Sequence, residues 1–256
     1  VSGNGPTSIT EIPEPDEAAL AHSQALQKAI CAEIESNDGH ISFERFMHMA
    51  LYEPGLGYYS AGARKFGKSG DFITAPEISP LFSICVARQC AQVLTQLEDA
   101  VILELGAGTG VMASDILLEL EKLDCLPDSY YILEPSADLR QRQQQLLEEK
   151  LPELVSRVSW LDALPDDSFN GIILANEVLD AMPVQRFCLY KDKNEQMCVA
   201  WQDNRFVWRH VAADEMLEEK IDNIVRQSVT GFSDGYCSEL NRDMEAWLNS
   251  LSQCLH

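Results

Sequence analysis

A glycine-rich loop is the segment of this sequence with the clearest chemical potential. It follows an apolar run of strand length and precedes a helical pattern. Glycines let the backbone turn sharply and approach a ligand closely, and the N-terminus of the next helix favours negative charge. The pattern therefore predicts a nucleoside-cofactor site, with a tight turn and no ligand as the simpler alternative. The predicted binding residues are Glu104, Gly106, Ala107, Gly108, Thr109 and Gly110.

The spacing of the glycines separates two kinds of cofactor. The dinucleotide fingerprint G-x-G-x-x-G requires a third glycine at position 111, which is Val111, because the third glycine comes one residue early at Gly110. Glu104 would also oppose a pyrophosphate, whereas it can pair with the ammonium of a methionine moiety. We therefore expect S-adenosylmethionine. An NAD-dependent oxidoreductase is disfavoured, and the sequence shows no evident Tyr-x-x-x-Lys proton-transfer motif.

Acidic residues follow the next two predicted strands. Glu134 lies 24 residues after Gly110, where a carboxylate accepts hydrogen bonds from ribose hydroxyls in doubly wound folds. Asp162 follows the third strand and is expected to meet the adenine amino group. Solvated acids at the ends of strands are the simpler alternative for both residues.

A polar segment after the fourth predicted strand is the candidate catalytic region. It begins Asn176-Glu177 and is expected beside the transferable methyl group. If a helical turn begins at Glu177, Asp180 lies three residues later on the same face. Two carboxylates there can hold a guanidinium and orient its nitrogen, so Glu177 and Asp180 are the predicted catalytic residues and Asn176 a cofactor contact. An acid pair that only complements a helix dipole is the simpler alternative.

These residues need an alternating strand–helix framework, and the sequence predicts one. Repeated units of this kind form an open parallel sheet with right-handed crossovers, which binds ligands beyond the carboxyl ends of its strands. The predicted strands are Val101–Leu105, Tyr130–Leu133, Arg157–Leu161 and Gly171–Ala175, and the helices between them are Val111–Leu123 and Asp138–Lys150.

Other elements flank this core on both sides. Helices are predicted at Ala18–Glu35, at Phe43–Leu51 with Ser42 as N-cap, and at Ser79–Leu97. The aromatic, glycine-rich stretch from residue 52 to 77 is a candidate lid or substrate wall. An antiparallel meander is predicted at Val184–Tyr190, Gln196–Gln202 and Arg205–Val211, followed by helices at Asp214–Ser228 and Cys237–Leu255.

The pattern predicts two parts. Residues 1–97 form an N-terminal helical and lid segment, and residues 98–256 form the core with a β insertion at about 184–211. The last predicted helix has no following strand to cover it, so we expect a C-terminally truncated core.

The amino-acid composition limits the kinds of partner that this protein is expected to bind. A net charge of −22, with scattered basic residues, argues against nucleic acid and suits a basic protein substrate, or serves solubility alone. No apolar run is long enough for membrane insertion. The eight cysteines form no C-x-x-C pair and are expected to be free thiols, and no metal site is predicted. The N-terminus lacks signal or transit features, so we expect a cytoplasmic or already processed protein.

Taken together, the motifs resemble the MidA-like methyltransferases, the family of the mitochondrial complex I assembly factor that methylates an arginine of a complex I subunit. The segments that carry this resemblance are 41–43, 52–59, 70–79, 104–110 and 176–184. The block Gly70–Ser79 is the most specific of them. One departure is Ser83, where the family pattern has glycine, and another is the ending, because family members continue with a further strand and a long C-terminal part.

The resemblance implies a Rossmann-like class I methyltransferase fold of the α/β class, with S-adenosylmethionine as cofactor. It adds Gly70, Asp71 and Thr74 to the predicted cofactor contacts. It implies a protein substrate, with arginine favoured and a respiratory complex I subunit as a candidate. It also implies a location in the bacterial cytoplasm, or in the mitochondrial matrix for a eukaryotic chain. A non-catalytic, cofactor-binding assembly factor is the alternative, and the sequence does not predict the oligomeric state.

Overall fold

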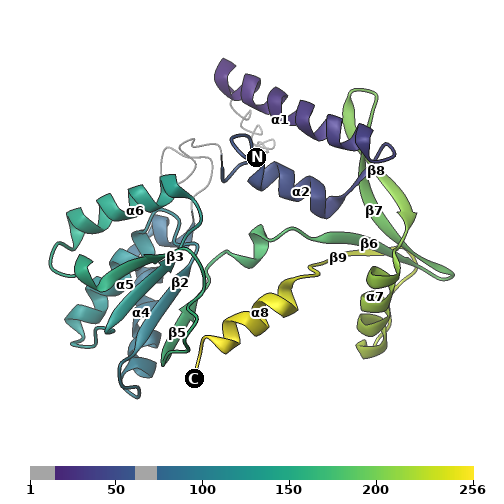
Figure 1. The fold of residues 1–256 in the computed structure, drawn as a ribbon. Helices are drawn as coiled ribbons and strands as arrows, with labels where there is room; N and C mark the ends of the chain where they lie inside the picture. The colour runs from purple at the N-terminus through teal and green to yellow at the C-terminus, as the bar shows by residue number, and fades with distance from the viewer. Residues whose placement is uncertain (1–14, 61–73) are drawn as a thin grey trace, which may run out of the picture.

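Two β-sheets organise the chain in the computed structural model, which describes residues 15–60 and 74–256 (Figure 1). One is a four-stranded sheet, and the other is a five-stranded antiparallel sheet. The helices α4, α5 and α6 lie beside the first sheet, and the helices α1, α2 and α7 lie beside the second. Within the described residues, no helix combines the length and apolarity needed to cross a membrane.

The four-stranded sheet is parallel throughout, which confirms the predicted open parallel sheet. Its strands are β2 (Val101–Leu105), β3 (Ser129–Leu133), β4 (Val158–Leu161) and β5 (Gly171–Leu174), in the order β4-β3-β2-β5. The chain builds β3 and β4 outward from one side of β2 and then crosses to place β5 on its other side. Ligands of such sheets bind where the strand order reverses, at the carboxyl ends of β2 and β5.

Strand β2 is buried at all of its positions because both faces of the sheet are covered. On one face, Ile102 packs with Ile116 and Tyr130 beneath three helices. Those helices are α4 (Pro80–Leu94), α5 (Val111–Lys122) and α6 (Ala137–Lys150). On the other face, Leu103 packs with Leu251 of α8 (Met244–Gln253). Adjacent strand residues point to opposite faces, so one short apolar run supports both layers.

The second sheet confirms the predicted meander. Its strands are β1 (Ile41–Ser42), β6 (Gln185–Tyr190), β7 (Lys193–Gln202), β8 (Arg205–Ala212) and β9 (Tyr236–Leu240). Strand β1 pairs with β7, and Ser42 then caps the next helix by accepting a 3.1 Å hydrogen bond from the Arg45 N–H, as predicted. Helices α1 (Glu17–Ser36), α2 (Phe43–Tyr52) and α7 (Glu215–Gln227) pack around this sheet.

The predicted helix Cys237–Leu255 is wrong over its first seven residues. Residues Tyr236–Leu240 form β9, which pairs with β6, and the helix begins only at Met244. The Asn241 side chain accepts hydrogen bonds from the N–H groups of Asp243 and Met244, at 2.8 and 2.7 Å. This turn separates the strand from α8, which then runs back toward the parallel sheet. Leu255, just after α8, forms an isolated β-bridge with Phe169, just before β5.

The expectation that all cysteines are free is also wrong. Cys188 of β6 and Cys237 of β9 are joined by a disulfide. The physical reason is the register of the two strands, which places these residues directly opposite each other. The sequence pattern did not indicate this disulfide, because it predicts that Cys237 lies in a helix. The other six cysteines are free.

Candidate functional site

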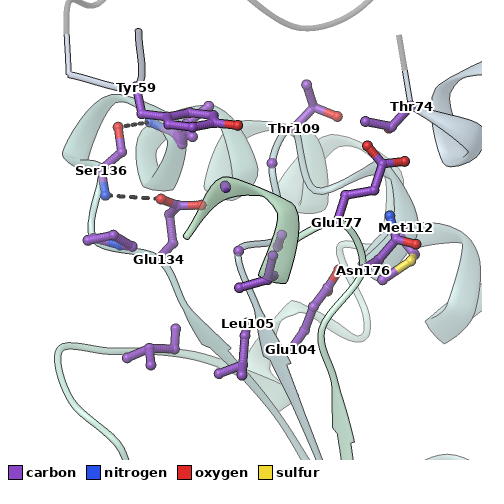
Figure 2. Close-up of a pocket in the computed structure, with 18 of the residues that line it drawn as sticks. Tyr59, Thr74, Glu104, Leu105, Thr109, Met112, Glu134, Ser136, Asn176 and Glu177 are labelled. Atoms are coloured by element: carbon purple, nitrogen blue, oxygen red, sulfur yellow. Dashed lines mark hydrogen bonds between the residues drawn. The ribbon is translucent and has the colours of Figure 1, made fainter. Parts of the chain in front are cut away.

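A cavity of about 1000 Å³ opens at the carboxyl ends of β2, β3 and β5 (Figure 2). Its size is that of a pocket for a small molecule. The glycine loop, the ends of the strands and the aromatic segment after α2 contribute its walls. Of the predicted site residues, it is lined by Thr74, Glu104, Gly106, Ala107, Gly108, Thr109, Glu134, Asn176, Glu177 and Asp180. Gly70 and Asp71 lie outside the described residues.

The loop has the left-handed backbone that its glycines permit, with φ of +64° at Gly106, +55° at Gly108 and +83° at Gly110. A Cβ at Gly108 would meet no atom within 4 Å, so its backbone stands open to a ligand. Gly110 is not placed where the sequence predicted. It does not line the cavity, and a Cβ there would lie 3.2 Å from the Gln143 Cγ, so it lets α5 pack against α6.

Glu104 lies beneath the loop and is only 1% exposed. Its Oε2 accepts a 2.7 Å hydrogen bond from the Tyr130 hydroxyl, and burial raises the pKa of Glu104 to about 7. Tyr130 is a hydrogen-bond partner of Glu104 that sequence reasoning missed. It appears in the sequence only as an aromatic strand residue, and the pairing of β2 with β3 brings its hydroxyl to the carboxyl group.

Glu134 faces the cavity from the end of β3 (Figure 2). Its Oε1 accepts a 3.0 Å hydrogen bond from the Ser136 N–H, and burial raises the pKa of this carboxyl group. Gln143 supports both Glu134 and the loop, because its Nε2 lies 3.4 Å from the Glu134 Oε2 and donates to the Gly108 carbonyl at 2.9 Å. Sequence reasoning missed Gln143, because its distinguishing feature is complete burial of its amide, which is visible only in the structure.

Asp162 is not placed where the sequence predicted. It does not line the cavity, and its side chain is 92% exposed. The physical reason is Arg140 of α6, whose Nη1 donates a 2.7 Å hydrogen bond to the Asp162 Oδ1 and holds the carboxylate at the surface. The expected contact with adenine therefore has no support from this geometry.

Glu177 and Asp180 reach the cavity by a different backbone from the expected helical turn. Glu177 has a left-handed φ of +53°, and a short 3₁₀ turn follows at Leu179–Ala181. The premise of a helix beginning at Glu177 is therefore wrong. Left-handed backbone at a non-glycine residue costs about 1–3 kcal/mol and is concentrated at functional sites. Both side chains are exposed, and neither makes a hydrogen bond with any residue in the described part of the chain.

An aromatic wall faces these two acids. The rings of Tyr52 and Tyr59 stack with their centroids 5.5 Å apart, and the Tyr52 hydroxyl donates a 2.7 Å hydrogen bond to the Ala181 carbonyl. Burial, the Tyr59 phenol and the Asp180 carboxylate raise the pKa of Tyr52 to about 12. The pKa of Tyr59 is also raised, chiefly by burial and then by Asp180. The acids and the phenols therefore belong to one site.

The cavity is acidic. Its lining holds six carboxyl groups and, among the described residues, no lysine, arginine or histidine. These carboxyl groups are those of Glu77, Glu104, Glu134, Asp138, Glu177 and Asp180. Such a lining attracts cations and repels a pyrophosphate. Within the same described residues, no cluster of acids, histidines and cysteines is arranged to hold a metal ion.

The reversal of strand order, the glycine loop, the Glu134 carboxylate and the acidic cavity together define the class, a class I S-adenosylmethionine-dependent methyltransferase fold. Residues 85–256 match the family described as "Putative S-adenosyl-L-methionine-dependent methyltransferase". The chain belongs to this family, which includes the MidA-like proteins that its motifs resemble. Its cofactor is S-adenosyl-L-methionine.

Solved structures and relatives agree with the family. A COG1565 superfamily member from Burkholderia thailandensis, crystallised with S-adenosyl-homocysteine, is 38% identical, with a TM-score of 0.85 over 96% of this chain and 63% of that one. The mitochondrial protein arginine methyltransferase NDUFAF7 homolog of Drosophila melanogaster is 29% identical over 211 residues. NDUFAF7 of Danio rerio is 28% identical over 191 residues. The matches cover 74% and 64% of this chain, and 48% and 45% of these two relatives.

Proposed function

We propose that the chain carries the cofactor site and part of the substrate site of a protein methyltransferase that modifies arginine side chains. The observation that carries this proposal is the pair Glu177 and Asp180 beside the stacked Tyr52 and Tyr59, in the same cavity as the glycine loop. The fly and zebrafish relatives are named as protein arginine methyltransferases, which supports the same substrate class.

The cofactor half of the site is assigned to the buried carboxyl groups. S-adenosylmethionine supplies an electrophilic methyl group on its sulfonium. Glu134 is suited to accept hydrogen bonds from the ribose hydroxyls because its carboxylate is held at the end of β3 by the Ser136 N–H. The open backbone at Gly108 allows close approach of the ligand, and Asn176 borders the same space.

The substrate half is assigned to the exposed acids. Carboxylate oxygens of Glu177 and Asp180 can accept hydrogen bonds from a guanidinium and turn one nitrogen toward the methyl group. As the new N–C bond forms and the C–S bond breaks, the attacking nitrogen gains positive charge. A neighbouring carboxylate stabilises this charge and accepts the proton that the nitrogen then loses.

The aromatic wall adds selectivity for a cation. A guanidinium stacks favourably on the face of a tyrosine ring, whereas a neutral amide gains less and a carboxylate is repelled by the acids. Tyr52 also ties the wall to the catalytic segment through its hydrogen bond to the Ala181 carbonyl. The wall therefore both recognises the substrate and positions the turn that carries Asp180.

The family resemblance suggests a respiratory complex I subunit as substrate, in the mitochondrial matrix or the bacterial cytoplasm according to the source of the chain. The test is incubation of the full-length protein with methyl-labelled S-adenosylmethionine and candidate subunits, followed by mass spectrometry. We expect label on an arginine, with none on a substrate in which that arginine is changed to lysine.

Gly106→Val serves as the inactive control for this experiment. Label on lysine or on a carboxyl group would contradict the arginine assignment. Binding of both S-adenosyl-homocysteine and the subunit without any transfer of label would favour the non-catalytic assembly factor instead.

A further inference from the structure

Glu77 is a cavity residue for which neither the sequence motifs nor the family match provides a role. It lies in the short helix α3 (Ala75–Ile78), directly before α4. Its Oε1 accepts a 2.9 Å hydrogen bond from the Thr109 hydroxyl, which ties α3 to the glycine loop. The contact joins residues 32 positions apart in the sequence, so only the fold brings this carboxyl group to the glycine loop.

The second oxygen of Glu77 lacks a partner. Oε2 is buried, and no hydrogen-bond donor among the described residues reaches it. A buried carboxylate oxygen without a donor is costly, because it has lost its hydration without replacement. The described lining of the cavity offers no lysine, arginine or histidine to neutralise it. A cationic donor that arrives with a ligand would supply the missing partner.

The position of Glu77 identifies the part of the ligand. Figure 2 shows Glu134 beside Ser136, whereas Thr109 of the loop lies away from Glu134, toward Thr74 and Glu177. With its ribose at Glu134, as proposed above, a nucleoside cofactor would direct its tail toward Thr109 and Glu177. In S-adenosylmethionine that tail carries an ammonium group.

Glu104 is the competing candidate for this ammonium, and its surroundings suit it less. Its Oε2 already accepts the Tyr130 hydrogen bond, and burial raises its pKa to about 7, which disfavours the charged form that an ammonium would need. Glu77 has one oxygen anchored and the other free of partners in the described structure. This arrangement resembles a preformed acceptor more closely than Glu104 does.

We propose that Glu77 binds the ammonium of the amino-acid tail of S-adenosylmethionine through Oε2, while Thr109 holds Oε1 in place. The proposal rests on the cofactor assigned above and adds a residue to its site. Thr109 is then a positioning residue, since it acts through the carboxyl group of Glu77.

Calorimetric titration of the full chain with two ligands tests this role. S-adenosyl-homocysteine has the amino-acid tail, and 5′-methylthioadenosine has the same nucleoside without it. We expect Glu77→Gln to weaken binding of S-adenosyl-homocysteine by about tenfold to a hundredfold, the usual effect of losing a hydrogen bond to a charged group. Binding of methylthioadenosine should change by less than about twofold.

Two further variants complete the test. Glu134→Gln should weaken both ligands to the same extent, because both present the ribose. Thr109→Val should weaken only S-adenosyl-homocysteine, by about threefold to tenfold, which keeps the proposal testable if Glu77→Gln fails to fold.

Three results would overturn the role of Glu77. Unchanged binding of S-adenosyl-homocysteine to Glu77→Gln would exclude the ammonium contact. Equal weakening of both ligands would show that Glu77 only supports the loop. If the wild-type chain binds neither ligand, the cofactor assignment itself fails, which is a distinct outcome from the first two.

Discussion

Two pairs of carboxyl groups in the cavity are held in opposite ways. At the end of the cavity that we assign to the cofactor, Glu104 and Glu134 are buried and hydrogen-bonded by Tyr130, Ser136 and Gln143. At the other end, the Glu177 and Asp180 side chains are exposed. The cofactor is the same in every reaction cycle, so internal hydrogen bonds can hold its carboxyl groups in place in advance. Acceptors for a protein substrate must instead remain free until the substrate binds.

The parts of the fold that carry the two ends also differ. The cofactor end rests on the buried parallel strands, whose sharp turn at the glycine loop is determined by local sequence. The substrate end is assembled from the segment after α2 and the turn after β5, which approach each other only in the folded chain. A substitution at one end should therefore leave the function of the other end intact, so that cofactor binding and substrate modification can be measured separately.

The largest effect is expected at the glycine loop. Gly106→Val places a β-branched side chain at a φ of +64°, with its Cβ 3.3 Å from the Val178 Cγ2. We expect the affinity for S-adenosyl-homocysteine to fall by about a hundredfold or more, measured by calorimetry.

Gly231→Val is the matched control for that change. Gly231 has a similar φ of +66°, and a Cβ there would meet nothing within 4 Å. It should share the backbone strain while changing the affinity by less than about twofold. Equal losses in the two variants would show that general destabilisation, not the loop, controls binding.

Glu104 should make stability depend on pH. Burial raises its pKa from 4.5 to about 7, so the folded chain holds a proton there that the unfolded chain releases. The folded state binds more protons between these values, so this group lowers stability as pH rises through that range, by about 3 kcal/mol in total.

Glu104→Gln should remove this dependence. The measurement is thermal unfolding of the chain without cofactor between about pH 4.5, the ordinary carboxyl pKa, and about pH 7.5. The stability of the variant relative to the wild type should increase as the pH rises. Parallel curves for the two proteins would mean that Glu104 ionises without penalty.

Glu134→Ala probes the proposed ribose contact. We expect the affinity for S-adenosyl-homocysteine to fall by about tenfold, since hydrogen bonds to a charged group are lost. Asp162→Asn is the control, because its carboxylate is at the surface with Arg140. A larger loss from Asp162→Asn would restore the sequence-based expectation that Asp162 meets adenine.

The smallest effect is expected from the aromatic wall. Tyr52→Phe keeps the ring and removes the hydrogen bond to the Ala181 carbonyl. Methyl transfer should fall by about fivefold in kcat/KM, corresponding to about 1 kcal/mol, with cofactor affinity unchanged. An equal fall in affinity for S-adenosyl-homocysteine would connect the wall to the cofactor instead.

Sequence reasoning succeeded where the information is local. The parallel strands, the glycine loop and the capping by Ser42 follow from hydrophobic period, glycine spacing and side-chain chemistry within a few residues. The positions of Glu104 and Glu134 at the cavity follow from the same rule, because both lie at the ends of predicted parallel strands.

The features that sequence reasoning missed depend on contacts between residues that are far apart in the sequence. Gln143 and Glu77 reach the loop through tertiary contacts, and Arg140 draws Asp162 away from the cavity. The strand containing Cys237 forms because β6 offers it an edge, which overrides a helical pattern. None of these contacts has a signature in the spacing of residues along the chain.

The separation of the two carboxyl sets is tested most directly by the double variant Glu177→Gln/Asp180→Asn in the full-length protein. The measurement pairs the Kd for S-adenosyl-homocysteine with the rate of methyl transfer to the identified substrate. We predict a Kd within about twofold of wild type and a transfer rate lower by about a hundredfold or more. Loss of cofactor binding, or transfer at the wild-type rate, would contradict this division of the cavity.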